Sequence, residues 1–335
     1  MTARTLSLGG TLLAVFLFGC GGDENPDPSP RRSADGGTLP PTAWRAAVGD
    51  DGTIVETFAD STWTAGRLGD EDLYAVSCVS NQVGWAVGSG GSIFHTRDSG
   101  SSWWPQSSPF SDDLLATAFA IDETGAYVGI IAGQAGALGV TRDGSASWHA
   151  VETGFDGALR GAATTQGATL LLASGDDGVV FRSEDLGDTW SQVVISGAGA
   201  LLDIAADASG ALVLASDDQG AIWASRDRAL SFSKEATANG ALASVSVGYD
   251  GALAVAAGAD GLALVRDSAG WRAIGTGTTA DLHAALVAPN GQDFYLAGDA
   301  GTLIESQDHG ASFIRTEFSS AVSVALRGIE DLSAR

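Results

Sequence analysis

The sequence is poor in the residues from which metal and redox sites are usually built. Its 335 residues include two cysteines and four histidines, and the histidines (His95, His149, His283 and His309) are scattered along the chain. No Cys/His spacing typical of zinc is present, so we expect no metal and no cofactor. The glycine-rich segments connect one β-rich run to another rather than to a helix, which argues against a phosphate-binding loop.

Basic residues are also scarce. The chain has 17 Lys and Arg against 41 Asp and Glu, and its formal net charge is −24. A field of this sign repels nucleic acid and anionic lipid surfaces, and it attracts cations or basic protein patches. We therefore expect a protein partner and no nucleic-acid partner. One possibility is that the protein partner has a basic surface. A compositional bias toward aspartate explains the charge equally well.

Helical periodicity is missing after the first 20 residues, and a short repeated phrase takes its place. The pattern Ser/Thr-x-Asp-x-Gly-x-Thr/Ser-Trp/Phe recurs seven times at intervals of about 42 residues. Its clearest copies are Thr96 to Trp103 and Ser183 to Trp190. Repeats of this length, built of short β-rich runs and turn residues, are typical of propeller blades. The sequence therefore predicts an all-β, seven-bladed β-propeller with four antiparallel strands per blade.

The repeated phrase resembles the Asp-box, or BNR repeat, and it predicts a tight turn between two strands. The Asp can accept hydrogen bonds from N–H groups of its own turn, the Gly can adopt a positive φ, and the aromatic can pack between sheets. Because the phrase recurs in every unit, we interpret it as structural rather than catalytic. Its residues are Asp98, Asp143, Asp185, Asp227, Asp267 and Asp308, with Trp63, Trp103, Trp148, Trp190, Phe232, Trp271 and Phe313. The degenerate copies at Asp60, Asp143 and Asp267 predict less regular turns.

The two ends of the repeat array predict how the ring closes. The first unit begins directly with Trp44 to Val48 and lacks an innermost strand. The segment from Ala325 to Ile329 resembles the start of another unit, Leu159 to Ala162. We therefore expect the C-terminal strand to complete the first blade, which removes both exposed sheet edges. Residues 42–335 then form one propeller, and we expect a monomer.

The N-terminal residues read as an export signal rather than a membrane span. Residues 1–20 combine Arg4 with an apolar core too short to cross a bilayer, and they end in Leu17-Phe18-Gly19-Cys20, which resembles a bacterial lipobox. This predicts an acylated Cys20, a lipoprotein of the bacterial cell envelope on the outer membrane or periplasmic face, and no other membrane contact. An ordinary secretory signal or an uncleaved anchor is the alternative.

The residues that follow the signal predict a flexible connection. Residues 21–41 are rich in Pro, Gly, Asp and Ser and offer almost nothing to bury, so we expect a disordered tether between lipid and propeller. With Cys20 acylated no disulfide is available, and Cys78 is expected to be buried in an apolar strand.

One face of the predicted propeller should collect negative charge. Loops between the second and third strands of a blade, and loops between blades, share the face opposite the boxes. The acids assigned to this face include Asp50, Asp51, Asp176, Asp177, Asp217 and Asp218. They could dock a basic partner or divalent cations, or they could serve only as turn formers.

A second candidate site is one mouth of the central channel. The residues that follow the leucine at the start of each inner strand should line this mouth. They are Tyr74, Ala116, Arg160, Asp203, Ala243, His283 and Arg327. The ring could bind an anionic ligand, or Arg160 and Arg327 could pair with nearby carboxylates.

The stretch Gly84 to Ile93, followed by Thr96-Arg97-Asp98-Ser99-Gly100, resembles the photosystem II stability and assembly factor family. The resemblance covers the repeats from about residue 43 to 330. It implies a seven-bladed BNR-type propeller, with lipoproteins among the bacterial members. The function that follows is a lipid-anchored, non-catalytic scaffold that binds a protein partner, as an envelope or membrane-complex assembly factor.

An enzymatic alternative uses the same repeats. Sialidases and some glycoside hydrolases carry these boxes on propellers, so a glycan-cleaving or glycan-binding propeller is the competing hypothesis. The resemblance to sialidases would imply an Arg-Ile-Pro motif, and Arg45 is followed by Ala-Ala instead. A hydrolase needs two carboxylates at a set separation, and the sequence offers no means of choosing two among 41. We therefore expect no enzyme activity.

Overall fold

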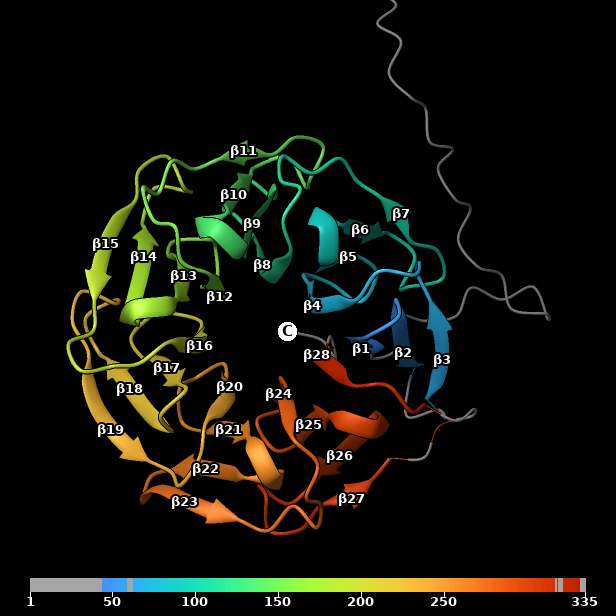
Figure 1. The fold of residues 1–335 in the computed structure, drawn as a ribbon, viewed down its shortest axis with the longest axis vertical. Helices are drawn as coiled ribbons and strands as arrows, with labels where there is room; N and C mark the ends of the chain where they lie inside the picture. Colours follow the sequence, from blue (N-terminus) through green and yellow to red (C-terminus); the bar gives the residue numbers. More distant parts are fainter. Residues whose placement is uncertain (1–43, 59–62, 317, 319–321, 332–335) are drawn as a thin grey trace, which may run out of the picture.

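The structure is a computed structural model, and it describes residues 44–58, 63–316, 318 and 322–331. The predicted signal segment, Cys20 and the predicted tether lie outside the described residues. Seven antiparallel sheets of four strands surround a central axis, as Figure 1 shows. The prediction of a seven-bladed, all-β propeller is confirmed. No helix in the described part of the chain has the length and apolar character needed to cross a membrane.

The blades are numbered in chain order, and strands are given from the axis outward. Blade 1 contains β28 (Leu326–Asp331), β1 (Trp44–Gly49), β2 (Thr53–Phe58) and β3 (Thr64–Arg67). Blade 2 contains β4 (Leu73–Cys78), β5 (Gly84–Gly88), β6 (Ile93–Thr96) and β7 (Trp104–Pro105). Blade 3 contains β8 (Leu114–Ile121), β9 (Tyr127–Gly133), β10 (Leu138–Thr141) and β11 (His149–Ala150). Blade 4 contains β12 (Leu159–Thr164), β13 (Leu171–Gly175), β14 (Val179–Ser183) and β15 (Ser191–Val194).

Blades 5 to 7 follow the same plan. Blade 5 contains β16 (Leu201–Ala206), β17 (Val213–Asp217), β18 (Ala221–Ser225) and β19 (Ser233–Thr237). Blade 6 contains β20 (Leu242–Val247), β21 (Ala254–Gly258), β22 (Ala263–Asp267) and β23 (Gly270–Ile274). Blade 7 contains β24 (Leu282–Val287), β25 (Phe294–Gly298), β26 (Thr302–Ser306) and β27 (Ile314–Arg315). Short 3₁₀ turns join the second and third strands in five blades: η1 (Ser89–Gly91), η2 (Gln134–Gly136), η3 (Asp176–Gly178), η4 (Ala259–Gly261) and η5 (Asp299–Gly301).

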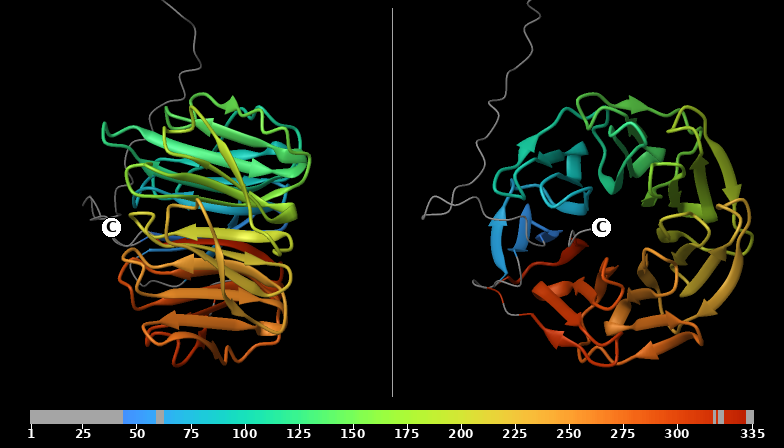
Figure 2. Two further views of the ribbon diagram at one scale, coloured as in Figure 1. Left: turned by 90° about the vertical axis from the view of Figure 1, so that its left-hand side faces the viewer. Right: turned by 180° about the vertical axis from the view of Figure 1, so that it is seen from behind.

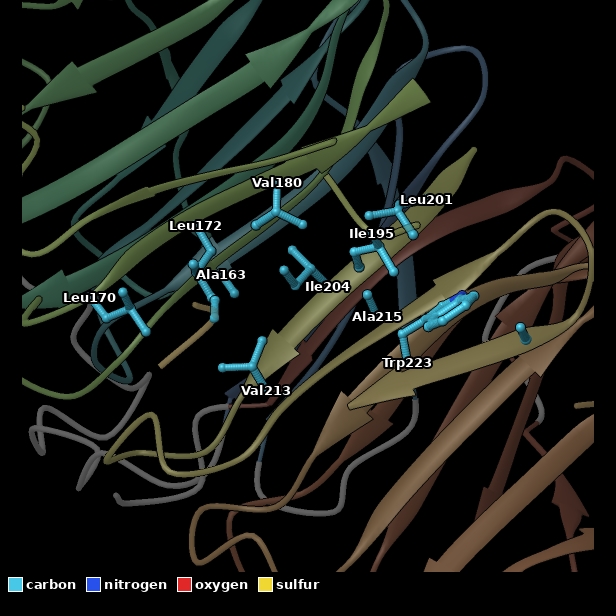
Figure 3. Close-up of a cluster of buried hydrophobic side chains, with 12 residues drawn as sticks. Ala163, Leu170, Leu172, Val180, Ile195, Leu201, Ile204, Val213, Ala215 and Trp223 are labelled. Atoms are coloured by element: carbon cyan, nitrogen blue, oxygen red, sulfur yellow. The ribbon is translucent and has the colours of Figure 1, made fainter. Parts of the chain in front are cut away.

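The hydrophobic core consists of clusters that lie between neighbouring blades. Figure 3 shows the cluster between blades 4 and 5, where Leu172 and Val180 of one sheet meet Leu201, Ile204 and Trp223 of the next. Because each sheet has a blade on both sides, every residue of β13, β14, β17 and β18 is buried. This explains why these strands consist mainly of apolar residues, and why the few polar ones among them, such as Arg182 and Asp217, are buried as well. Each fully buried aliphatic side chain contributes about 1.5–3 kcal/mol.

The C-terminal strand closes the ring as predicted. β28 pairs antiparallel with β1, with Ala47 opposite Ile329 and Arg45 opposite Asp331. The Arg45 guanidinium donates to the Asp331 carboxylate at 2.7 Å, and both side chains are largely buried. Blade 1 therefore draws its innermost strand from the opposite end of the sequence.

Strand alternation gives the propeller two distinct faces. Loops between first and second strands lie on the same side as the Asp-box turns, which we call the box face. Loops between second and third strands lie with the blade-to-blade loops on the other side, which we call the acidic face. In the side view of Figure 2 the strands run between these faces. Trp44 begins β1 and Asp331 ends β28, so both lie at the box face.

Ring closure yields a testable prediction. Replacing Asp331 with Ala leaves Arg45 without its buried carboxylate, and we expect the free energy of unfolding to fall by about 3 kcal/mol. The matched control is Asp70→Ala, because Asp70 is 99% exposed and its 3.5 Å pair with Arg67 is worth about 0–1 kcal/mol. Chemical denaturation measures both, and equal losses for the two variants would contradict a closing role for the pair.

Candidate functional site

The Asp-box turns share one hydrogen-bonded clasp. In blade 4 the Ser183 hydroxyl donates to Asp185 at 2.7 Å, and the same carboxylate accepts the backbone N–H and hydroxyl of Thr189. The Ser183 hydroxyl oxygen also accepts the N–H of Gly187. The hydroxyl-to-Asp bond recurs in blades 2, 3, 5 and 7 at Asp98, Asp143, Asp227 and Asp308.

The clasp stabilises the charged form of its carboxylate. Hydrogen bonds from the Thr189 hydroxyl and N–H lower the pKa of Asp185 to about 2, and similar bonds lower the pKa of Asp227 and of Asp308 to about 2. All the donors belong to the turn itself. The geometry therefore supports the structural interpretation of these aspartates.

One prediction about the degenerate boxes is wrong and one is confirmed. Asp143 has the full clasp, because the turn needs two consecutive residues with positive φ and Gly144 (69°) and Ser145 (72°) supply them. A glycine at either place satisfies the turn. At Asp267 the chain forms a tight hairpin instead, and its carboxylate accepts one backbone bond, from Ala269. Asp60 lies outside the described residues.

Each box aromatic packs against the preceding blade, as the sequence predicts. Trp103 contacts the cluster that contains Trp44 of blade 1, and the two rings lie 6.1 Å apart. The others pack into the clusters at the remaining six interfaces: Trp63, Trp148, Trp190, Phe232, Trp271 and Phe313.

Three blades place an arginine or a histidine against a carboxylate at the acidic-face mouth of the channel. The second residue of the inner strand pairs with the first residue of the loop after the second strand. These pairs are Arg160 with Asp176 at 2.9 Å, Arg327 with Asp50, and His283 with Asp299 at 2.7 Å. Of the two options that the sequence leaves open for the arginines, the structure shows pairing.

The register of the predicted mouth ring needs a correction. In all seven blades a bulge follows the opening leucine, as between Leu201 and Asp203. Leu115 and Leu202 therefore occupy the place of Tyr74, Arg160 and His283. The predicted Ala116 and Asp203 lie one residue further along their strands. The cause is the double leucine that opens both strands.

The mouth leads into a central cavity with a volume of about 380 Å³. Its entrance carries Tyr74, Arg160, His283 and Arg327, and the Arg327 guanidinium lies 5.9 Å from the Tyr74 ring centre. Below the entrance the wall consists mostly of Ala, Ser, Thr and Val, with Asp203 set among them. Shape and polarity therefore make this cavity a candidate site for a small polar group.

Asp203 joins two blades from within the cavity wall. Its carboxylate accepts the Ser244 hydroxyl at 2.8 Å and the Val245 N–H at 3.0 Å, both from blade 6. Burial is the dominant effect and raises the pKa of Asp203 to about 6, although these hydrogen bonds oppose the shift. The Ser244 oxygen in turn accepts the Ala285 N–H of blade 7. The sequence analysis did not predict these bonds between blades. The available signal was the presence of polar residues, such as Asp203 and Ser244, on inner strands.

The predicted acidic residues divide into two groups. Asp217 is buried and its carboxylate accepts bonds from Gln219, Ala221 and the Trp223 indole, so it does not belong to a binding surface. Asp50 and Asp176 are ion-paired as described. Asp51, Asp177 and Asp218 are exposed on the acidic face, together with Asp112 and Asp156.

Some blade-to-blade acids have a structural role. Asp72, Asp113 and Asp281 accept the N–H of Asp51, Gly90 and Asp260, and each bond joins one blade to the next. By contrast, the carboxylates of Asp112, Asp156, Asp177 and Asp218 make no hydrogen bond or ion pair with another described residue. Among the described residues, no group of three or more His, Cys, Asp and Glu is placed to hold a metal ion.

A sequence model of the family described as "Photosynthesis system II assembly factor YCF48" matches residues 55–333. The chain belongs to this family. No match is found among curated proteins.

Solved structures place the YCF48-family chain among known propellers. A structure described as YCF48 bound to D1 peptide is 19% identical, with a TM-score of 0.59, covering 77% of this chain and 90% of that one. YCF48 from Cyanidioschyzon merolae is 13% identical, with a TM-score of 0.60 and coverages of 77% and 88%. The WD40 propeller domain of Doa1 is 14% identical, with a TM-score of 0.60 and coverages of 76% and 85%. At these identities the likeness shows the fold alone.

For this YCF48-family propeller the box clasp predicts a stability difference between blades. Asp185→Ala removes three accepted bonds and should lower the free energy of unfolding by about 1–2 kcal/mol at pH 7. Asp267→Ala removes one accepted bond and a partly exposed ion pair with Arg272 at 3.8 Å, which is worth little, and it should cost about half as much. Because the pKa of Asp185 is lowered, its stabilisation is present above pH 4 and is lost as the pH falls toward 2. Denaturation at several pH values measures this, and equal costs at both sites would contradict it.

Asp203 predicts a pH dependence of opposite sign. Its pKa of about 6 lies above the ordinary value of 3.8, so the folded state holds a proton that the unfolded state has released. The free energy of unfolding should therefore fall by about 2 kcal/mol as the pH rises from 4 to 7.

The variant Asp203→Asn isolates this contribution, since an amide does not titrate. Its unfolding free energy should lack that decrease, whatever its constant offset from the parent protein. Thermal or urea unfolding between pH 4 and 7 provides the comparison, and parallel pH profiles for the two proteins would refute the shifted pKa.

Proposed function

We propose that this propeller is a non-catalytic scaffold that binds a protein partner through its acidic face and is held at the bacterial cell envelope by a lipid on Cys20. Membership of an assembly-factor family is the observation on which this depends most. A related propeller has been solved with a bound peptide, which makes peptide binding a reasonable expectation for this fold.

The partner chemistry follows from the acids that the fold does not use. Asp112, Asp156, Asp177 and Asp218 are exposed carboxylates from four different loops of one face. These carboxylates attract a basic segment of a partner, and because they make no bond within the propeller, none has to be broken when the segment binds. Turn formation explains Asp72, Asp113 and Asp281, but it does not require these four side chains.

The arrangement of the arginines favours a scaffold over a hydrolase. Arg160 and Arg327 are each held by a carboxylate of their own blade, so neither is available to converge on a substrate acid group. A glycan-cleaving or glycan-binding propeller remains the alternative function. Hydrolysis of a sialoside or β-glucan by the purified protein would establish it.

The anchor is proposed from sequence. Leu17 to Cys20 has lipobox form, and residues 21–41 have the composition of a flexible connection. Mass spectrometry of the mature N-terminus tests acylation of Cys20, and Cys20→Ser should release the protein from the membrane fraction.

Charge neutralisation tests the docking surface. The quadruple variant with Asn at positions 112, 156, 177 and 218 should bind an isolated basic partner segment, or an oligolysine peptide as probe, at least about tenfold more weakly at low salt. Its affinity should also depend less on ionic strength. Glu123→Gln, an exposed acid on the box face, is the control and should bind like the parent. Salt-independent binding, or equal affinity for the quadruple variant, would rule out electrostatic docking at this face.

A further inference from the structure

The central cavity contains a carboxylate that no described basic side chain neutralises. The seven innermost strands surround the axis, as Figure 1 shows, and the cavity of about 380 Å³ lies between them. Asp203 of β16 lines this cavity and is partly accessible from it. Its carboxylate accepts the N–H of Ile204, the N–H of Val245 and the hydroxyl of Ser244, which are all neutral donors. Among the described residues, no Lys, Arg or His side chain forms an ion pair with it.

The basic side chains at the cavity entrance are already bound to other carboxylates. Arg160 pairs with Asp176 at 2.9 Å, Arg327 pairs with Asp50, and His283 is held by an aspartate in the same way. Each of these contacts brings as much negative charge as positive charge to the entrance. The exposed acids of the acidic face surround it. The entrance therefore does not repel a cation that approaches the cavity.

The elements packed against β16 supply no counter-ion for Asp203. β12 contributes Arg160, which is bound to Asp176 of η3, and the remaining charge of η3 is the exposed Asp177. β17 contributes Asp217, whose carboxylate accepts bonds from its own loop, and β13 and β20 contribute no charged residue. Burial without a counter-ion disfavours the charged form, which raises the pKa of Asp203 to about 6. A carboxyl group of this kind in a cavity is a candidate for binding a ligand.

Backbone carbonyl groups lie on the same strand edge as this carboxylate. An innermost strand pairs within its sheet on one side only, so its other edge faces the adjacent blade and the axis. The N–H groups of Val245 and Ala285 lie on this edge, because they donate to Asp203 and to Ser244. In an antiparallel strand the N–H and C=O of one residue point to the same side, so the carbonyl oxygens of these two residues lie there as well. Carboxylate and carbonyl oxygens are the acceptors that suit an ammonium or guanidinium group.

We infer that the central cavity binds one basic side chain of the partner segment, and that the charged end of this side chain pairs with Asp203. This inference rests on the proposed docking of a basic segment at the acidic face. Asp203 is the third residue of β16, about 7 Å from the start of the strand at that face. Lysine and arginine carry their charge at the end of a stem of three or four methylene groups, which suits a site at this depth.

A cation fits the cavity better than an anion. An anion would need Arg160 or Arg327, and each of these donates from Nε and from one Nη to a single carboxylate. An anion in the cavity would also lie near Asp203, and the wall carries a second carboxylate, Glu330, toward the box face. A cation gains attraction from the acidic face as it approaches and from Asp203 once it is inside.

A small cation tests the cavity separately from the surface. The probe is butylguanidinium, and its matched control is butylurea, which has nearly the same shape and no charge. In nuclear magnetic resonance spectra of the full chain in detergent, butylguanidinium should shift the amide signals of Ser244 and Val245, and butylurea should not. The affinity for the cation should be about tenfold higher at pH 7 than at pH 5, because the Asp203 carboxyl, with its pKa of about 6, loses its proton between these values.

Two variants assign the binding to the cavity. Asp203→Asn should lower the affinity at pH 7 at least about tenfold and remove its pH dependence. Ala243→Phe, which narrows the cavity at its mouth and leaves Asp203 in place, should also weaken binding, so the test does not depend on the folding of one variant. The control is Asp260→Asn, at an exposed acid of η4 on the same face, and it should bind like the parent.

Three results would overturn the inference. They are parent-like affinity in Asp203→Asn or Ala243→Phe, equal binding of butylurea, and binding of butyl phosphate in place of the cation, which would assign the site to the arginines.

The cavity and the docking surface can fail separately in these experiments. Binding of oligolysine without any binding of butylguanidinium would refute the cavity site and leave the proposed docking intact. Binding of butylguanidinium without binding of oligolysine would refute the docking surface and leave the cavity as a site for cations.

Discussion

The pairing of β28 with β1 is the contact on which the rest of the architecture depends. No blade has a hydrophobic core of its own, because each cluster is shared by two neighbouring sheets. A ring with one missing contact would expose two sheet faces, whereas a closed ring exposes none. Closure also brings Arg45 and Asp331 together and fixes which loops share a face.

The repeated blades use the same positions for different purposes. The first residue of the loop after the second strand is a paired Asp in blades 1, 4 and 7, and the preceding residue is Gly. That Gly is required where the neighbouring loop comes close: a Cβ at Gly49 would lie 2.0 Å from the Ala325 carbonyl oxygen, and one at Gly175 would lie 2.0 Å from that of Ala158. In blade 5 Asp217 stands at this place and turns its carboxylate onto its own loop. Function is therefore expected where blades depart from their common pattern.

Much of the fold could be predicted from the sequence, because it depends on features that recur. Seven copies of one sequence phrase, with aromatics that fill the gaps between sheets, leave few alternatives to a seven-bladed ring. The box at Asp143 was harder to interpret, since a sequence pattern does not show that glycine suits either of two adjacent left-handed positions. The predicted mouth residues were wrong by one position in blades 3 and 5, because each inner strand opens with two leucines and the first of them, not the second, begins the strand. The polar residues on the inner strands, Asp203 and Ser244 among them, hint at bonds between blades, but the choice of partner depends on how neighbouring blades are placed.

The adjacency of Arg45 and Asp331 has a consequence for the genetics of this fold. The two ends of the ring lie side by side, with Arg45 opposite Asp331. The same ring could therefore fold from a chain that begins at a different strand. Joining residue 331 to residue 44 by a short linker and opening the chain at an exposed turn such as Gly154 would yield the same disc from a reordered gene. Duplication followed by shifted start sites is therefore a simple evolutionary route by which such repeat arrays can change their starting strand without losing their shape.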